Sequence, residues 1–175
     1  LRDLCTKAGA VLIFDEIQTA RMSVGGMQAR LRITPDMTTL GKFFGGGLAF
    51  GAFGGRAAIM DRFDPARPDA LPHAGTFNNN SLTMAAGLAA IDHYLGAEAL
   101  EALYQRGEAF RSRLNATFTA SGLAFEATGI GSILNIHARL PDPAEAQAAR
   151  RLLQFEMLER GQYFAARGLI ALSLA

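Results

Sequence analysis

Short apolar runs and helical patterns alternate along the first part of the chain. Residues 1–8 carry apolar side chains on one helical face, and Gly9 is placed to end that helix, because glycine readily adopts the left-handed cap conformation. The apolar run 10–14 follows at once and ends abruptly at Asp15. A continuous apolar run between turn residues is typical of a strand buried on both faces of a parallel sheet. The pattern predicts an α/β fold with a mostly parallel sheet and flanking helices.

Further elements follow from the same patterns. We predict strands over 37–40 and 48–53, short helices near 27–31 and 57–63, and an exposed, proline-rich connector over 64–72. The polar turn 73–80 leads into a helix for which Ser81 is the predicted N-cap. The expected apolar face of this helix comprises Leu82, Ala85, Ala86, Leu88, Ala89 and Leu95, and a second helix is predicted over 98–119.

The pattern changes after Gly122. Alternating residues predict strands over 123–127 and 132–138, then a helix from Asp142, as N-cap, to about Arg160. Two more strands are predicted over 163–165 and 169–174. This order predicts a smaller α+β domain, so we divide the chain into residues 1–96, the C-terminal portion of a large domain, and residues 97–175, an incomplete small C-terminal domain.

An acid and an amine follow neighbouring predicted strands. Asp15 comes directly after the run 10–14, and Lys42 follows the strand 37–40. Open α/β sheets bind ligands at the carboxyl ends of their strands. Lys7 and Lys42 are the only lysines among 17 basic residues, and a desolvated lysine can attack a carbonyl where arginine cannot. A lysine on the surface of a loop is the alternative at this point.

Pyridoxal phosphate needs this pair of groups. It forms a Schiff base with a lysine, while a carboxylate keeps its pyridine nitrogen protonated. Two other phosphate-binding patterns do not fit. A P-loop requires Ser or Thr after its lysine, where this chain has Phe43. A dinucleotide-binding loop requires glycines directly after the first strand, where this chain has the sequence Asp-Glu-Ile-Gln.

Composition narrows the class of protein. Half of the residues are hydrophobic and the net charge is +1, which is typical of a globular domain and gives no basic stripe for nucleic acid. No apolar segment approaches the roughly 20 residues that a membrane-spanning helix requires. The single cysteine, Cys5, indicates a reducing compartment, so we expect a cytoplasmic protein. The three histidines lack metal-ligand spacing, so no metal site is expected.

Four motifs in order carry a family resemblance. Residues 12–19, residues 35–42 with the glycines 45–47, residues 54–56 and residues 73–77 together resemble the class III aminotransferases. The branch that is most similar holds glutamate-1-semialdehyde aminomutases and β-amino-acid aminotransferases. The resemblance implies part of a fold-type I large domain and its small C-terminal domain. It also implies a fragment without the upstream phosphate loop and ring-stacking residue, which is expected to be inactive alone.

The resemblance also implies residue roles. Lys42 would be the catalytic Schiff-base lysine and Asp15 would hold the pyridine nitrogen of the cofactor. Ile17 would pack on the ring, Gln18 would bind the 3′-oxygen, and Thr76 would bind the cofactor phosphate of the neighbouring subunit in a homodimer. Glu16 and Arg56, by contrast, are expected to be structural.

The expected activity is amino transfer between an amino acid, with β-amino acids as one candidate, and a keto acid. Two alternatives stay open. The first is an isomerase of the glutamate-1-semialdehyde 2,1-aminomutase type. The second is a protein that keeps the fold without the reaction.

Overall fold

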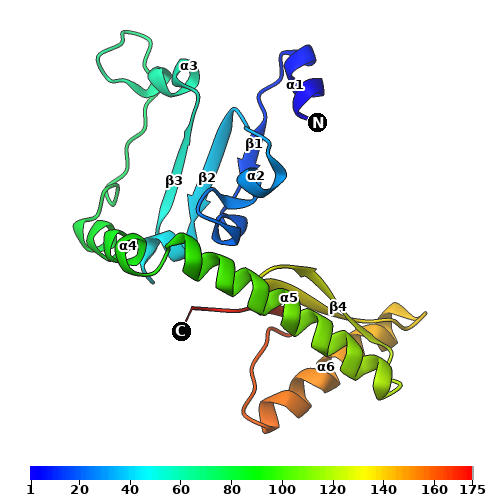
Figure 1. Ribbon diagram of the computed structural model, residues 1–175. Coiled ribbons are helices and arrows are strands. Elements are labelled where there is room, and N and C mark those ends of the chain that lie inside the picture. Colours follow the sequence, from blue (N-terminus) through cyan, green and yellow to red (C-terminus); the bar gives the residue numbers. More distant parts are fainter. Residues whose placement is uncertain (175) are drawn as a thin grey trace. The chain divides into compact units, whose positions relative to one another are not determined.

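The computed structural model describes residues 1–174 and divides into two compact units, Leu1–Leu100 and the residues from Glu101 onward. Figure 1 shows the elements of both units. In the described residues, no helix is both long enough and apolar enough to cross a membrane. The assignment of residues 1–96 and 97–175 to the large and small domains of a complete enzyme stays a prediction.

The first unit holds a three-stranded sheet, in which β2 (Met37–Gly41) lies between β1 (Ile13–Asp15) and β3 (Gly51–Gly55). β1 and β2 are parallel, with Ile13 opposite Met37, and β3 is antiparallel to β2 (Figure 1). The other elements of this unit are α1 (Arg2–Ala8), η1 (Thr19–Met22), α2 (Gly26–Leu31), η2 (Lys42–Gly45), α3 (Ala57–Met60), η3 (Asp61–Phe63) and α4 (Ser81–His93).

Two strands differ from the sequence prediction. β1 begins at Ile13 rather than at residue 10, and it is not buried on both faces, because Val11 and Ile13 are 55% and 53% exposed. β3 begins three residues later than predicted. Its delay has a local cause: Gly46 and Gly47 have positive φ angles, and Leu48 N–H donates to the Gly45 carbonyl, so the chain turns before it extends.

Asp36 joins three elements of this unit. Its Oδ2 accepts from Leu12 N–H and from Arg2 Nη1, and its Oδ1 accepts from Arg56 Nη1, all at 2.8 Å. The hydrogen bond from the Leu12 backbone, followed by those from Arg56 and Arg2, holds the pKa of this carboxyl well below its usual range. The predicted structural role of Arg56 is confirmed, because the residue anchors the end of β3 to this carboxylate.

Glu16 is also structural, as predicted. It is 1% exposed, and its carboxylate accepts from Met27 N–H at 3.1 Å and from Gln28 N–H at 2.7 Å, in the first turn of α2. The Thr19 hydroxyl donates to the same carboxylate. A negative charge on the free N–H groups at a helix start is favourable, so Glu16 fixes α2 against the end of β1.

α4 differs from the prediction at its N-cap and in the face that it buries. Asn80, rather than Ser81, is the N-cap, and its Oδ1 accepts from the Leu82 and Thr83 N–H groups. The buried residues of α4 are the small ones, Thr83 and Gly87. The large apolar side chains are exposed instead: Leu82, Met84, Leu88, Ile91 and Tyr94.

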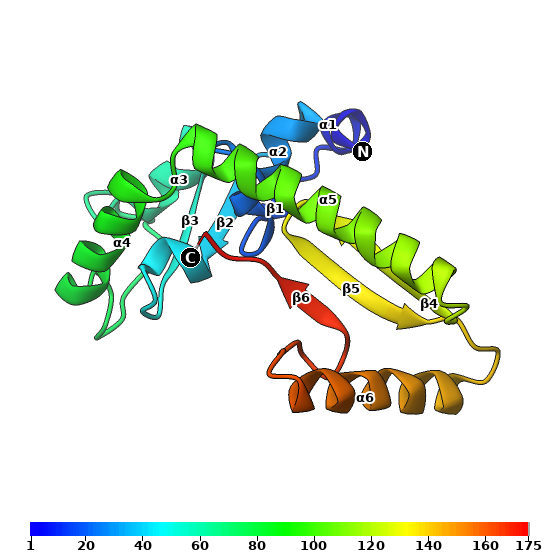
Figure 2. The ribbon, with the colours of Figure 1, turned by 60° about the horizontal axis from the view of Figure 1, so that its bottom comes forward.

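The second unit is a three-stranded antiparallel sheet with helices (Figure 2). β5 (Ile133–Ala138) pairs with β4 (Phe125–Ile130) and with β6 (Leu169–Ala171), and α6 (Pro143–Glu159) connects β5 to β6. α5 (Ala97–Ala120) begins in the first unit and continues into the second. The core of this unit is built from α5, α6 and the strands: Leu114, Phe118, Phe125, Ala127, Ile136, Leu153, Met157, Phe164 and Ile170.

The predicted helix cap in this unit is confirmed, and the strand predicted over 163–165 is wrong. β4 begins at Phe125 rather than at residue 123, and β6 ends at Ala171 rather than at residue 174. Asp142 caps α6, and its Oδ1 accepts from Ala144 N–H at 2.8 Å. Residues 163–165 form no strand. Phe164 is buried in the core instead, while Gly168 N–H donates to Ala165 O and Ala165 N–H donates to Leu169 O, which closes a tight turn.

Candidate functional site

Asp15 is the last residue of β1, and its position is fixed by its neighbours. Its Oδ1 accepts from Ile17 N–H at 3.0 Å and from the Thr39 hydroxyl on β2 at 3.2 Å. Thr39 lies directly opposite Asp15 in the parallel pairing. The side chain is exposed rather than buried as the apolar run had suggested, and in residues 1–174 its second oxygen, Oδ2, has no hydrogen-bond partner.

Lys42 begins η2, directly after the last residue of β2. Its φ angle is 54°, in the left-handed region that disfavours residues with a side chain by about 1–2 kcal/mol. Its own side chain is exposed, whereas Gly41 before it is buried. Unfavourable backbone conformations of this kind are concentrated at functional sites.

The sheet register brings the acid and the lysine to the same edge. Because β1 and β2 run in parallel, their carboxyl ends meet, and Gly41 lies two residues beyond the Asp15–Thr39 pair. Gly41 is closely packed at this edge, with Phe50 and Ile17 as its neighbours. A Cβ atom added there would lie 3.2 Å from the Phe50 carbonyl oxygen and 3.4 Å from Ile17 Cγ2.

These residues fit the cofactor expected from the sequence. A protonated pyridine nitrogen needs a carboxyl oxygen that is free to accept, and Asp15 Oδ2 has no hydrogen-bond partner in the part of the chain that the structure describes. An aldehyde needs a reachable amine, and Lys42 is exposed at the same edge. The side chain of Ile17 lies beside Gly41, the residue before Lys42.

The other two candidate residues, Gln18 and Thr76, lie at the start of η1 and in the turn before α4. Gln18 follows Ile17 and is the N-cap of η1, with its side chain exposed. Thr76 lies in the exposed turn 76–79 before α4, away from β1 along the chain. The structure therefore groups Asp15, Ile17 and Lys42 at one sheet edge and places Thr76 on a separate turn.

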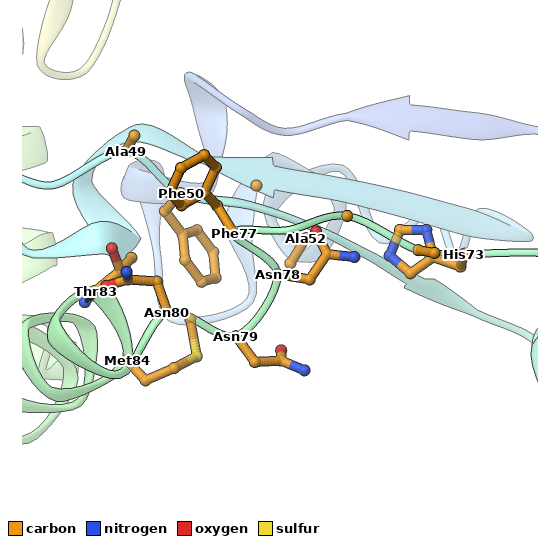
Figure 3. Close-up of a pocket in the computed structure, with 13 residues that line it drawn as sticks. Ala49, Phe50, Ala52, His73, Phe77, Asn78, Asn79, Asn80, Thr83 and Met84 are labelled. Carbon is orange, nitrogen blue, oxygen red and sulfur yellow. Dashed lines mark hydrogen bonds between the residues drawn. The ribbon is translucent and has the colours of Figure 1, made fainter.

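A cavity of about 630 Å³ opens beside the turn that contains Thr76 (Figure 3). Its lining comes from β3 and the preceding residues, from the turn itself, and from the start of α4. Phe50 and Phe77 contribute aromatic surface, and Asn78, Asn80 and Thr83 contribute polar atoms (Figure 3). At the far side, the ring of His73 lies edge-on to Phe53, with ring centroids 5.2 Å apart.

Comparison with known proteins decides the family. The profile of the class III aminotransferases matches residues 1–168. The chain belongs to the class III aminotransferases. The β-phenylalanine transaminase of Variovorax paradoxus is 48% identical over 181 residues, and this alignment covers 99% of the chain and 42% of that enzyme. The glutamate-1-semialdehyde 2,1-aminomutase of Nitratidesulfovibrio vulgaris is 41% identical over 173 residues, which cover 94% of the chain and 40% of that enzyme.

Solved structures of two transaminases share the fold of this chain. A β-phenylalanine aminotransferase from Variovorax paradoxus superposes with a TM-score of 0.91 at 46% identity, and a transaminase with PLP bound superposes with the same TM-score at 34% identity. Each match covers 99% of this chain and 42% of the solved chain. The predicted family and the fold-type I class are thus confirmed, and pyridoxal 5′-phosphate is indicated as the cofactor of the family. The chain spans about two fifths of the length of these relatives.

Sequence patterns did not single out two residues at this site. Thr39 stood in the predicted strand 37–40, but only the register of β1 against β2 shows that its hydroxyl meets Asp15. Phe50 was assigned to a buried strand, yet its backbone borders Gly41 and its ring lines the cavity. The signal that could have found Thr39 is the alternation of β2, which puts Thr39 and Gly41 on one face.

Proposed function

We propose that this chain belongs to a longer pyridoxal-phosphate-dependent aminotransferase that moves an amino group between an amino acid and a keto acid. β-Amino acids are the proposed amino donors, because the β-phenylalanine transaminase of Variovorax paradoxus is 48% identical over almost the whole chain. The observation that carries the proposal is the register of the parallel pair β1–β2, in which Asp15 ends β1 and Lys42 directly follows the end of β2.

Lys42 is the proposed reacting amine. Its amine would hold the cofactor at the aldehyde group and, when free, would carry a proton between substrate and cofactor carbons. Once bound, the cofactor supplies a ring that takes up the electron pair left when the substrate C–H bond breaks. Because Lys42 follows β2 directly, the sheet fixes the starting point of its side chain while the amine stays reachable.

Asp15, Ile17 and Gln18 are the proposed holders of the ring. Asp15 would accept the pyridine N–H on Oδ2, since Oδ1 already accepts from Ile17 and Thr39. An ionised acid at that nitrogen stabilises its protonated form through a charge-assisted hydrogen bond. Ile17 would pack on the ring face and Gln18 would donate to the 3′-oxygen.

Thr76 is proposed to bind the cofactor phosphate of a neighbouring subunit in a homodimer. Its turn is exposed, and the adjacent Phe77 is 83% exposed, as expected of a segment that serves another chain. The chain by itself is proposed to be inactive, and the assembled enzyme is proposed to be cytoplasmic.

The test uses the full-length protein loaded with pyridoxal phosphate. Incubation with β-phenylalanine and an α-keto acid acceptor should release the keto product of the donor and aminate the acceptor in equal amounts. Lys42→Ala should abolish both, whereas Lys7→Ala should leave both unchanged, because Lys7 lies at the exposed end of α1. Failure of a fully loaded wild-type protein to aminate the acceptor would contradict the proposal.

A glutamate-1-semialdehyde 2,1-aminomutase-type isomerase is the second candidate, favoured by the 41% identity with the Nitratidesulfovibrio enzyme. Such an enzyme keeps the carbon skeleton bound and returns the amino group to it, so it needs no external acceptor. This alternative predicts that glutamate-1-semialdehyde is isomerised when no keto acid is added. It also predicts that an added keto acid is not aminated. A protein that keeps the fold without the reaction would show neither outcome.

A further inference from the structure

The turn that carries Lys42 packs against α4 with almost no side chain between the two backbones. A Cβ atom added at Gly87 of α4 would lie closer than 3.0 Å to the carbonyl oxygen of Phe44, in the middle of η2. A Cβ atom added at Gly46 would lie equally close to the carbonyl oxygen of Ala86. Each element thus presents a glycine to a backbone oxygen of the other, and both close approaches lie within the first compact unit.

Phe50 approaches the same turn just as closely. A Cβ atom added at Gly45 would lie 2.6 Å from the Cβ of Phe50, and one added at Gly41 would lie 3.2 Å from the Phe50 carbonyl oxygen. Lys42 lies between these two glycines along the chain. The turn therefore packs closely against Phe50 as well as against α4.

Close packing around the turn can hold Lys42 in an unfavourable backbone conformation. Its φ of 54° is a left-handed value that costs a residue with a side chain about 1–2 kcal/mol. The face of α4 turned inward is the one with small side chains: Thr83 and Gly87 are buried, while Leu82 and Leu88 are 72% and 59% exposed. The small side chains on this face are what allow the close backbone contact with η2.

We propose that Gly87 is a positioning residue for Lys42: it lets α4 seat against η2 closely enough to fix the direction in which the lysine leaves the sheet edge. The proposal rests on the proposed function of Lys42 and extends it to a residue 45 positions further along the chain. Gly87 itself acts only through the backbone of η2.

A single methyl group tests this. An alanine at position 87 places its Cβ well inside the van der Waals distance to Phe44 O, so α4 or η2 must shift by on the order of 1 Å. A displacement of that size at a reacting group can lower a rate by about 100-fold. Alanine also favours a helix interior over glycine by about 1 kcal/mol, so the substitution does not weaken α4 through helix propensity.

The measurement is covalent trapping in the full-length protein. Wild type, Gly87→Ala and Gly96→Ala are saturated with pyridoxal phosphate, treated with borohydride, and analysed by mass spectrometry for the fraction of Lys42 that carries the cofactor. Gly96→Ala is the matched control, since it lies just beyond α4 and an added Cβ there meets nothing within 4 Å. Equilibrium dialysis measures total cofactor affinity in the same samples, and steady-state kinetics separates kcat from KM.

We expect Gly87→Ala to lower the trapped fraction at Lys42 at least threefold and kcat by roughly 10- to 100-fold, while total cofactor affinity and KM stay within about threefold of wild type. Gly96→Ala should match wild type. Equal trapping in Gly87→Ala and Gly96→Ala would overturn the positioning proposal and leave the function of Lys42 intact. Wild-type protein that traps cofactor elsewhere than at Lys42 would instead overturn the proposed function.

A second variant covers the case in which Gly87→Ala does not fold. Ala86→Ser adds one atom at the neighbouring position, where the Ala86 backbone and Cβ already border Gly46. It should lower trapping at Lys42 in the same direction and to a smaller extent. Unchanged trapping in a folded Ala86→Ser variant would then decide against a positioning role for this contact.

Discussion

The Thr39 hydroxyl donates to Asp15 across the parallel strands β1 and β2, with Oγ1 and Oδ1 3.2 Å apart. The Ile17 N–H donates to the same oxygen. Two donors on one oxygen orient the carboxylate and leave the other oxygen without a hydrogen-bond partner among residues 1–174. An acid that must meet one nitrogen of a planar ring benefits from being oriented before the ring arrives.

Thr39→Val should weaken cofactor binding without unfolding the protein. Valine keeps the β-branched shape of threonine but cannot donate, and one such hydrogen bond contributes about 0.5–1.5 kcal/mol, or roughly a two- to tenfold change in Kd. Titration of the apo full-length protein with pyridoxal phosphate measures this change. Thr39→Ser keeps the hydroxyl and should bind nearly as wild type does. Equal affinity in the Val and Ser variants would show that Thr39 does not orient Asp15.

Glu16→Ala should destabilise the protein without acting on the chemistry directly. The buried carboxylate accepts from the Met27 and Gln28 N–H groups, and its removal leaves both donors without their partner at a cost of roughly 2–4 kcal/mol. The midpoint of thermal unfolding should fall by several degrees. Glu159→Ala, at the exposed end of α6, is the control and should leave the midpoint unchanged. A Glu16→Ala midpoint equal to that of the control would refute the role of this carboxylate in fixing α2.

Asp36 should make the stability of the first unit depend on pH in the acid range. Its folded-state pKa lies below its ordinary value of about 3.9, so the ionised form is favoured in the folded state. This contribution is complete above the unfolded-state pKa and is lost as the pH falls toward the folded-state pKa. Asp36→Asn should therefore be less stable than wild type at pH 7, and the difference should shrink below about pH 4.

Denaturant unfolding at pH 7, 4 and 3 measures the Asp36 effect. Asp92→Asn, at an exposed position of α4, is the matched control and should follow wild type at each pH. A gap between wild type and Asp36→Asn that stays constant from pH 7 to pH 3 would show that ionisation of Asp36 does not contribute.

The sequence predicted the parts of this fold that depend on local pattern. Gly9 has a φ of 64° and ends α1, Asp142 caps α6, and β2 begins at Met37, as glycine preference, side-chain capping and apolar pattern had indicated. The placement of Asp15 and Lys42 at one edge also followed from pattern, because parallel strands share their carboxyl edge.

The features that the sequence did not predict depend on contacts between distant segments. The inward face of α4 consists of small residues because η2 approaches it through Gly46, and no periodicity within α4 alone could reveal that neighbour. Asp36 stood within a recognised motif, but its bonds to Leu12, Arg2 and Arg56 join three separate elements. Tyr163 and Phe164 alternate like a strand, yet burial of Phe164 in the core decides the local structure.

Lys42 is the proposed amine that meets the cofactor at the sheet edge where Asp15 lies. Borohydride reduction of the loaded full-length protein, followed by peptide mass mapping, tests this proposal most directly. We predict a pyridoxyl phosphate mass on the peptide that contains Lys42 and none on the peptide that contains Lys7, the only other lysine of this chain. A label on any other lysine of the protein, with the Lys42 peptide unmodified, would contradict the account.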